Sequence, residues 1–355
     1  MSLAELRLED LRCLPAAQLT LHPRLNLISG PNGSGKTSVL EAIYLLGRGR
    51  SFRTRLTEQL IRHGASALQL FGRIARPDGL AREIGLACRK PSGVEAHLDG
   101  RPVESLADLS EAFPVQVIDP GIHRLVEEGP PHRRRWLDWV VFHVEPDFVR
   151  HWQAYSRALR QRNAALRCGS DPMVWDAELI RSGSLLSAAR ARLLEALQPY
   201  WAAALRDLDA VPASLGYHQG WNRDQELSAA LRDHILRDRE RGSTAYGPHR
   251  FDVLLRLDNH PARGLVSRGQ QKLLGAAMVL TMTRFVIEQA GRVPTLLLDD
   301  PAAELDRDHT ERLLGAVAAL GGQLVVTALR PQDSRFGAPD RAFHVEHKEV
   351  KTAIL

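Results

Sequence analysis

Residues 30–37, GPNGSGKT, form a pattern that could hold the phosphates of a nucleotide. They match G-x-x-x-x-G-K-[ST] and lie between an expected strand at 19–29 and an expected helix at 38–46, the context that this motif requires. Glycines there let backbone N–H groups turn toward phosphate oxygens, a lysine adds charge at the β/γ-phosphates, and a threonine hydroxyl binds Mg²⁺. The residues of the expected nucleotide site are Gly30, Asn32, Gly33, Ser34, Gly35, Lys36, Thr37 and Ser38.

A second pattern places two carboxylates directly after a strand. Residues 295–298, TLLL, predict a buried strand that is followed by Asp299 and Asp300. Such a strand would bring Asp299 beside the Mg²⁺ ion, while Asp300, one residue further, could polarise an attacking water. With the phosphate loop present, we expect Lys36, Asp299 and Asp300 to be catalytic, and Thr37 and Asp299 to bind the metal.

A third pattern, Ser267-Arg268-Gly269-Gln270, comes at the start of an expected helix at 270–289. Two interpretations stay open for it. A serine at a helix start is commonly an N-cap. The same motif order also occurs in ATPases that share one nucleotide between two subunits, where the serine, the glycine backbone and the helix N-terminus contact the γ-phosphate held by the other subunit. Taken jointly, the three patterns indicate an ATPase that dimerises around ATP.

The three patterns lie in strand-rich ends of the chain that flank a helical middle. From about residue 132 to 208 the sequence is helical and rich in arginine, and the turn at 168–172 divides it into two amphipathic helices expected to pack as a hairpin. We expect residues 1–125 and 244–355 to form one α/β domain and residues 126–243 to form an inserted helical lobe. Further strands are expected at 68–75, 83–88, 94–98, 115–118, 251–258 and 323–329.

Composition excludes several classes of protein. The chain has 355 residues, of which 44% are hydrophobic, so it is too apolar to be mainly disordered and long enough for about two domains. Its three cysteines, Cys13, Cys88 and Cys168, lie far apart, so neither a disulfide framework nor a structural zinc site is expected. We also expect no signal peptide, no membrane span and a reducing, cytoplasmic location.

The position of the basic residues is more informative than the net charge of +5, which only weakly indicates a polyanionic partner. Residues 132–167 contain many arginines and few acids, which favours sequence-independent contact with DNA phosphates. Residues 237–242, RDRERG, are typical of a solvated, self-paired helix face. The basic loop 48–55 could serve the nucleotide base, a dimer interface or DNA. The DNA-binding candidates are Arg133, Arg134, Arg135, Arg157 and Arg160.

Over residues 3–345 the chain resembles the RecF family of SMC-like ATPases. The resemblance implies an α/β P-loop head of the ABC/SMC type, built from both chain ends, with an inserted, mainly helical second lobe. It also implies an ATP- and Mg²⁺-dependent homodimer with slow hydrolysis, DNA binding at gaps or junctions, and action with RecR and RecO to load RecA. The segments that carry it, besides the phosphate loop, are SFRTR (51–55), PGIHRLVEEGPPHRRRWLD (120–138), YGPHRFD (246–252), SRGQQKLL (267–274) and LLLDDPAAELD (296–306).

The resemblance also implies roles for single residues. Asp300 stands where transporter-type relatives usually have glutamate, and the shorter side chain suggests a slow switch rather than a motor. The resemblance further implies a weak ATPase that DNA stimulates. Thr327 stands where those relatives carry a switch histidine. The signature residues, which would face the partner's ATP, are Ser267, Arg268, Gly269 and Gln270, and the D-loop residues are Ala303, Glu304, Leu305 and Asp306.

Two other functions compete with this interpretation. A transport ATPase subunit would predict a membrane partner and is disfavoured by the long, basic helical insertion. A DNA-binding scaffold in which the nucleotide is only structural would be favoured if Asp300→Asn left turnover and DNA behaviour unchanged.

Overall fold

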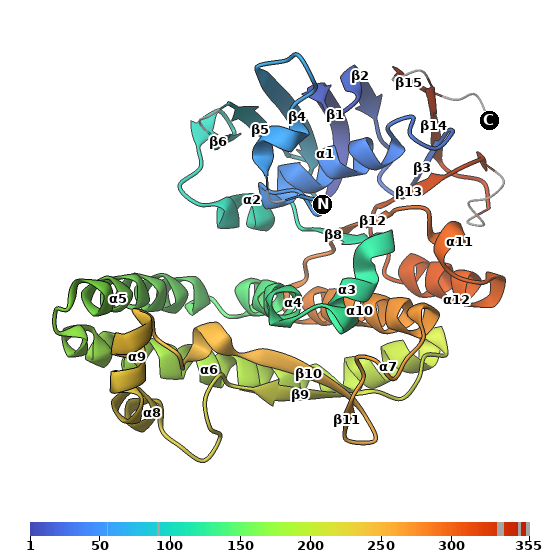
Figure 1. Ribbon diagram of the computed structural model, residues 1–355. Helices are drawn as coiled ribbons and strands as arrows, with labels where there is room; N and C mark the ends of the chain where they lie inside the picture. Colours follow the sequence, from blue (N-terminus) through green and yellow to red (C-terminus); the bar gives the residue numbers. More distant parts are fainter. Residues whose placement is uncertain (55, 91–92, 332–336, 347–348, 353–355) are drawn as a thin grey trace. The chain divides into compact units, whose positions relative to one another are not determined.

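The computed structural model describes residues 1–54, 56–90, 93–331, 337–346 and 349–352 (Figure 1). The chain divides into two units, each with its own core. The first contains residues 1–122, 207–209 and 291–355, and the second contains residues 123–206 and 210–290. The P-loop and the acidic strand end belong to the first unit, and the serine-glycine signature segment belongs to the second.

A mainly parallel sheet in the first unit brings its motifs to one edge. Its strand order is β15-β14-β3-β13-β12-β8, and all neighbouring pairs except β14 with β15 are parallel. Because carboxyl ends of parallel strands meet at the same edge, the residues after β3 and β12 and at the end of β13 come together there. The strands are β3 (Leu25–Ser29), β8 (Val115–Ile118), β12 (Thr295–Leu298), β13 (Leu324–Ala328), β14 (Arg341–Glu346) and β15 (Glu349–Thr352).

An antiparallel sheet forms the other layer of the first unit, with strand order β2-β1-β4-β5-β6-β7. Helix α1 (Lys36–Arg48) contacts strands of both sheets, and every residue in it except Thr37 is buried, which explains its nearly continuous apolar sequence. The strands of this sheet are β1 (Ser2–Leu11), β2 (Leu14–Thr20), β4 (Ala67–Ala75), β5 (Ala81–Arg89), β6 (Gly93–Leu98) and β7 (Arg101–Pro102).

The strand expected at 19–29 is two strands in the structure. β2 ends at Thr20 and β3 begins at Leu25. Between them the Asn26 side chain accepts the His22 N–H at 2.7 Å and donates to the His22 carbonyl at 2.7 Å. This local turn chemistry competes with strand formation, and alternation of apolar residues alone does not reveal it.

The remaining helices of the first unit are short. α2 (Leu106–Ala112) begins with a capping box at Ser105 and Asp108 and packs against α1. The segment after β12 contains α11 (Pro301–Glu304) and α12 (Arg307–Ala318). The single turns η1 and η2 cover Thr57–Leu60 and Pro120–His123.

The second unit is mainly helical and contains a small sheet of order β11-β10-β9. α5 and α6 pack against each other across the short turn η3, so the predicted hairpin packing is confirmed for these two helices. Each half of the stretch 132–208 contains two helices where one was predicted, α4 and α5 before the turn and α6 and α7 after it. The helices are α3 (Arg124–Glu127), α4 (Pro130–Val144), α5 (Phe148–Cys168), α6 (Asp176–Ala196), α7 (Gln198–Leu208), α8 (Leu227–Asp233), α9 (Ile235–Arg241) and α10 (Arg268–Ala290). The strands and turns are β9 (Ser214–His218), β10 (Asp252–Leu257), β11 (His260–Pro261), η3 (Pro172–Trp175) and η4 (Pro248–Arg250).

Arg162, within the basic stretch 132–167, is a core residue of this hairpin. Its side chain is fully buried and donates to Asp176 at 2.8 Å, Asp238 at 2.7 Å and the Thr244 hydroxyl at 2.7 Å. These bonds join α5 to the start of α6 and to α9. Arg162 therefore stabilises the core of the unit and is not part of a basic surface.

The units differ from the expected boundaries at two places. The first boundary lies at 122/123, close to the expected 125/126, but residues 207–209 belong to the first unit and residues 244–290 to the mainly helical unit. The physical reason is long-range pairing: β10 pairs with β9, and the Trp136 indole on α4 donates to the Met278 carbonyl on α10 at 2.8 Å.

Helix α10 alone among the described helices is long and apolar enough to cross a membrane by composition. Of its most apolar window, 72% is buried inside the protein. Such burial is typical of a core helix. Composition by itself does not distinguish a core helix from a membrane-spanning helix.

Candidate nucleotide-binding site

The loop between β3 and α1 depends on glycine at two positions. Gly30 has φ +150°, and a Cβ there would lie 2.2 Å from the Val345 carbonyl oxygen. Gly35 has φ +119°, and a Cβ there would lie 2.8 Å from Leu14 Cδ2. Both the backbone conformation and the close approach therefore exclude other residues. The first turn of a helix has N–H groups that the helix itself does not pair, so the start of α1 is suited to an anion.

Lys36 lies inside this loop with its ammonium group on the loop's own carbonyls. Nζ donates to Gly30 at 2.7 Å and to Pro31 at 3.0 Å, and the residue is only 7% exposed. Burial lowers the pKa of Lys36, while the carboxylates of Asp300 and Asp299 act in the opposite direction. Phosphate oxygens could take the place of the two carbonyls as acceptors, with stronger, charge-assisted bonds.

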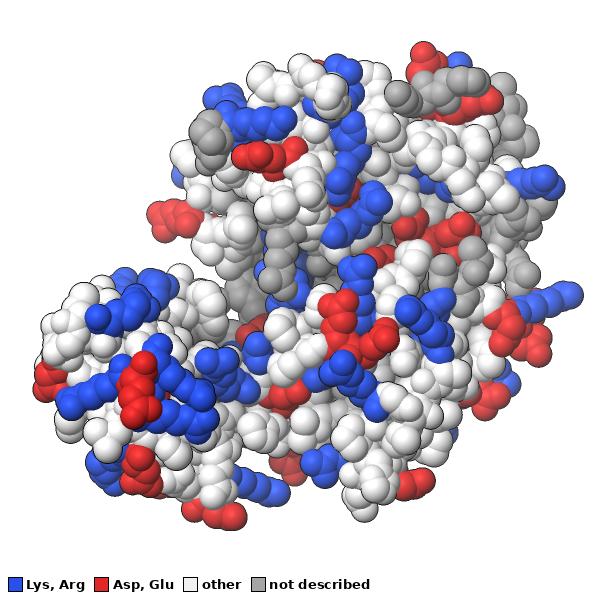
Figure 2. All heavy atoms as spheres, in the orientation of Figure 1, with Lys and Arg blue, Asp and Glu red and all other residues white. Residues whose placement is uncertain are grey.

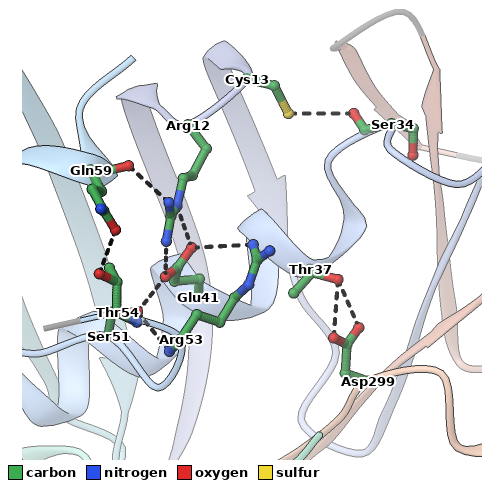
Figure 3. Close-up of polar contacts among 10 residues, drawn as sticks. All are labelled: Arg12, Cys13, Ser34, Thr37, Glu41, Ser51, Arg53, Thr54, Gln59 and Asp299. Carbon is green, nitrogen blue, oxygen red and sulfur yellow. Dashed lines mark hydrogen bonds and ion pairs between the residues drawn. The ribbon is translucent and has the colours of Figure 1, made fainter. Parts of the chain in front are cut away.

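Thr37 and Asp299 meet at the edge of the parallel sheet (Figure 3). The Thr37 hydroxyl lies 3.0 Å from both carboxylate oxygens of Asp299. A hydroxyl and a carboxylate suit Mg²⁺, which takes oxygen ligands and keeps several from water and phosphate. Among the described residues no group of three His, Cys, Asp or Glu side chains could hold a metal. Thr37 and Asp299 could supply oxygen ligands to an ion whose other ligands come from nucleotide and water.

Thr327 joins the two acidic residues after β12. Its hydroxyl donates to Asp299 Oδ1 at 2.8 Å and accepts the Asp300 backbone N–H at 2.9 Å. Asp300 has left-handed backbone angles, φ 48° and ψ 54°, which cost energy for a residue with a side chain. The fully buried Thr327 hydroxyl therefore helps to hold Asp300 in a conformation that its own preferences disfavour.

The other P-loop residues divide by burial. Asn32 and Gly33 are exposed at the tip of the loop, whereas Ser38 is buried in the first turn of α1. The Ser34 hydroxyl is buried and has no hydrogen-bond partner within the described part of the chain. A buried hydroxyl without a partner is costly, so a ligand oxygen at this position would satisfy it.

The sequence analysis missed a buried ion pair beside the site (Figure 3). Arg12 donates to the two carboxylate oxygens of Glu41 at 2.9 Å each, and Glu41 is fully buried. Ser51 also bonds to Glu41, and the Arg53 guanidinium lies 3.8 Å from it. The one acid in the apolar run of α1, placed one turn after Thr37, is the sequence signal that could have revealed it.

The contacts of Glu41 show that the described part of the basic loop 48–55, for which the sequence left three roles open, packs against α1. Arg12 also donates to the Gln59 carbonyl at 2.9 Å, so the Glu41 cluster ties residues 51–54 and 59 to α1. Arg55 lies outside the described residues.

The expected D-loop follows Asp300. The backbone of Ala303 and Glu304 completes α11, and their side chains lie outside the described part of the structure. Asp306 caps α12 by accepting the His309 N–H at 3.0 Å, and hydrogen bonds from His309 lower the pKa of its carboxyl group.

The expected signature residues begin α10 in the second unit. Ser267 accepts the Gln270 N–H at 3.3 Å, as an N-cap does, and Gln270 accepts the Val211 N–H at 3.2 Å. Ser267, Arg268 and Gly269 are exposed, and Arg268 lies 2.9 Å from the His123 ring. The hydrogen bond from Gln270 N–H to the Ser267 hydroxyl therefore fits the N-cap interpretation. Because Ser267 and Gly269 are exposed, the serine hydroxyl and the glycine backbone are also accessible to a second molecule.

Arg133 differs from the other four DNA-binding candidates. Its guanidinium binds both oxygens of Asp252, at 2.9 and 2.7 Å, and two backbone carbonyls. Because these hydrogen bonds already occupy the Arg133 guanidinium, we omit Arg133 from the candidate DNA-binding residues. Arg157 and Arg160 are exposed on α5. On the face drawn in Figure 2, Lys and Arg side chains gather over the end of the helical unit that carries α5 and α9.

Comparisons with known proteins give matches over nearly the whole chain. A family model described as the RecF/RecN/SMC N terminal domain matches residues 2–353. The DNA replication and repair protein RecF of Pseudomonas aeruginosa strain LESB58 is 38% identical over 99% of this chain and 97% of its own. RecF of Thioalkalivibrio sulfidiphilus is 39% identical over 99% of each chain. A solved structure of the recombination mediator protein RecF with ATP superposes with a TM-score of 0.89 at 23% identity, covering 99% of this chain and 98% of its own.

Proposed function

The chain belongs to the RecF family of DNA replication and repair proteins, and from this we propose that it is an ATP-operated switch that dimerises with ATP and opens on hydrolysis. The observation that carries the proposal is the hydrogen-bonded series Thr37–Asp299–Thr327–Asp300 beside the P-loop. It joins a metal-binding pair to a candidate water-activating carboxylate at one edge of a parallel sheet.

In this proposal the chain's own residues divide the chemistry. Lys36 and the backbone N–H groups of the loop bind the phosphates, and Thr37 and Asp299 would hold Mg²⁺, which neutralises phosphate charge when bound. Asp300 orients and polarises the attacking water. Because its side chain is one methylene shorter than glutamate, it positions water less well, and we expect slow turnover. From the family we further propose that DNA stimulates this turnover.

The signature segment would complete the partner's site. Ser267 and Gly269 lie exposed at the N-terminus of a 23-residue helix, where backbone N–H groups attract anions. In a homodimer they would contact the γ-phosphate bound by the other subunit, with Arg268, Gln270 and the D-loop at the same interface. ATP would then favour the closed dimer, because it contacts both subunits only in that state.

Family membership and the positions of the arginines support a proposal for the DNA and protein partners. Arg134, Arg135, Arg157 and Arg160 would bind DNA phosphates without reading sequence, at gaps or junctions in the cytoplasm. The solved RecF relative is described as part of the RecFOR pathway, which supports RecR and RecO as partners in loading RecA.

Sedimentation velocity of the wild type and Lys36→Met, with and without ATP and Mg²⁺, tests the switch. We expect the wild type to shift from monomer to dimer only with ATP and the variant to remain monomeric. Ser267→Arg should bind ATP and fail to dimerise, since the change adds bulk to the exposed signature. A wild type that remains monomeric at saturating ATP would contradict the shared-nucleotide mechanism.

A further inference from the structure

A pocket of about 330 Å³ lies within the second unit, and none of its lining residues belongs to the candidate nucleotide site. Helices α4, α5 and α6 and the turn η4 line it. Its charged lining residues are three arginines, Arg134, Arg135 and Arg190, and one carboxylate, Asp138. The pocket therefore has an excess of positive charge.

Only part of that charge is neutralised internally. Arg190 binds both oxygens of Asp138, at 2.8 and 3.0 Å, and lies 3.9 Å above the Phe251 ring. Arg134 donates to the Phe251 carbonyl at 3.0 Å and forms no ion pair with any described residue. Burial lowers the pKa of Arg134, the carboxylates of Asp252 and Asp138 act in the opposite direction, and the cations Arg250 and Arg190 act with burial. Because Arg134 forms no ion pair within the described part of the chain, an anion in the pocket could pair with its guanidinium directly.

The other side of the pocket is uncharged and partly aromatic. Tyr155 lies 2.7 Å from His249 Nδ1, and His249 Nε2 lies 3.1 Å from the Thr244 carbonyl. Burial lowers the pKa of His249 to about 4, so the ring is neutral at physiological pH. Trp152 and Leu159 of α5 supply an apolar wall, and Trp152 remains 47% exposed. The exposed indole is available for stacking.

We propose that this pocket binds one unpaired nucleotide of a DNA strand, with its base stacked on Trp152 and its phosphate paired with Arg134. The proposal rests on the proposed DNA-binding function and specifies its substrate as single-stranded DNA. Aromatic side chains beside cations are the combination that proteins use for single strands, and stacking tolerates any base. Ligand pockets start at roughly 300 Å³, so this one suits a single nucleotide and excludes a duplex.

The arrangement of α5 supports the same ligand. Ser156 and Leu159 line the pocket, and Arg160, one helical turn after Ser156, is exposed beside them. Arg157 is exposed on the same helix. Neither arginine forms an ion pair among the described residues, so both can bind phosphates that precede or follow the captured nucleotide. An acidic peptide would use the arginines but leave the Trp152 ring uncovered.

Fluorescence anisotropy with the full-length protein, ATP and Mg²⁺ tests the proposal. The probes are labelled oligo(dT) and a blunt duplex of equal length. We expect Trp152→Ala to weaken oligo(dT) binding by about 5- to 150-fold, the range for loss of one stacked base, and Trp152→Phe to retain most of it. Duplex affinity should change by less than about twofold, within the range of unrelated surface changes.

Arg134→Gln gives a second test that leaves the aromatic wall in place. It should reduce the salt dependence of oligo(dT) binding by about 0.7 in the log–log slope, the contribution of one phosphate contact. The matched control is Arg181→Gln on α6, because Arg181 is exposed and pairs with Glu178 instead of facing the pocket. This control should bind both probes as the wild type does.

Three results would overturn the pocket's role. The first is an unchanged oligo(dT) affinity in Trp152→Ala, Trp152→Phe and Arg134→Gln. The second is an equal loss of affinity for oligo(dT) and for the duplex in these variants. The third is a polyglutamate peptide that binds the pocket while oligo(dT) binding does not depend on the pocket. A wild type that binds neither probe in the presence of ATP would instead contradict the proposed DNA-binding function. The two failures are therefore distinguishable.

Discussion

The hydroxyl of Thr327 donates a 2.8 Å hydrogen bond to Oδ1 of Asp299 and so joins the ends of two adjacent parallel strands. The same hydroxyl oxygen accepts the N–H of Asp300 at 2.9 Å. Thr327 thus contacts the expected metal ligand and the backbone of the expected water-activating residue. The resemblance places Thr327 at the expected switch position, and in the structure its hydroxyl holds the backbone of Asp300.

Thr327→Val should lower kcat more than it raises KM for ATP. Valine keeps the shape but leaves Asp300 N–H without its acceptor, which costs about 1–3 kcal/mol and corresponds to roughly 5- to 150-fold. Steady-state ATPase assays on DNA measure both constants. Thr327→Ser, which keeps the hydroxyl, should restore most of kcat. Equal kcat in the wild type and Thr327→Val would show that Asp300 needs no such anchor.

Asp300→Asn should abolish most hydrolysis and preserve ATP-dependent dimerisation. A general base contributes about 10²- to 10⁴-fold, and asparagine cannot accept the proton. Single-turnover hydrolysis and sedimentation in ATP measure the two properties. Asp300→Glu is the informative comparison. Because the longer glutamate side chain reaches the water more easily, this variant should hydrolyse ATP at least as fast as the wild type. Turnover by Asp300→Asn at the wild-type rate would favour the scaffold interpretation.

Asp299→Asn should raise the Mg²⁺ concentration needed for nucleotide-dependent dimerisation. The change replaces the negative carboxylate, whose oxygens lie 3.0 Å from the Thr37 hydroxyl, with a neutral amide that binds Mg²⁺ more weakly, and we expect a rise of about tenfold or more. Titration of Mg²⁺ at fixed ATP, followed by light scattering, measures it. Thr37→Ala should show the same direction. Unchanged Mg²⁺ dependence in both variants would place the ion elsewhere.

Arg162→Met should destabilise the helical unit. Its removal leaves Asp238, which is 1% exposed, without its charged partner, and breaking a buried pair costs about 3–5 kcal/mol. Urea unfolding followed by circular dichroism measures the change. Arg181→Gln, which removes an exposed ion pair, should cost less than about 1 kcal/mol. Similar midpoints for the two variants would be inconsistent with a structural role for the Arg162 bonds.

His249 should make the protein less stable in mild acid. Its pKa is lowered from 6.5 to about 4 in the folded protein, so between these values the unfolded chain binds a proton that the folded one does not. Its contribution to stability is therefore complete above pH 6.5 and is lost as pH falls toward 4, by about 3 kcal/mol in all.

Unfolding free energies at pH 7 and pH 4.5 for the wild type and His249→Gln measure this contribution. The variant should lose less stability than the wild type over that interval, because glutamine does not titrate. An identical loss in both proteins would assign the acid sensitivity to other groups.

Local sequence patterns were sufficient for the parts of the site that are contiguous. The P-loop, α1, β12 and β13 follow from glycine spacing and from apolar runs, because backbone preference and burial pattern act over a few residues. The predicted strand at 19–29 joins the end of β2 to β3, since a turn formed by the Asn26 side chain leaves the alternation of apolar residues intact.

Contacts between distant residues depended on packing. Thr37 and Asp299 lie 262 positions apart and meet because parallel strands align their carboxyl ends at one edge. Arg133 looks like Arg134 and Arg135 in the sequence, but it is held by Asp252, 119 residues away. Residues 244–290 joined the helical unit through β9 and α4. Which charges are paired and which remain available depends on burial and long-range pairing, and these arise only when the whole chain folds.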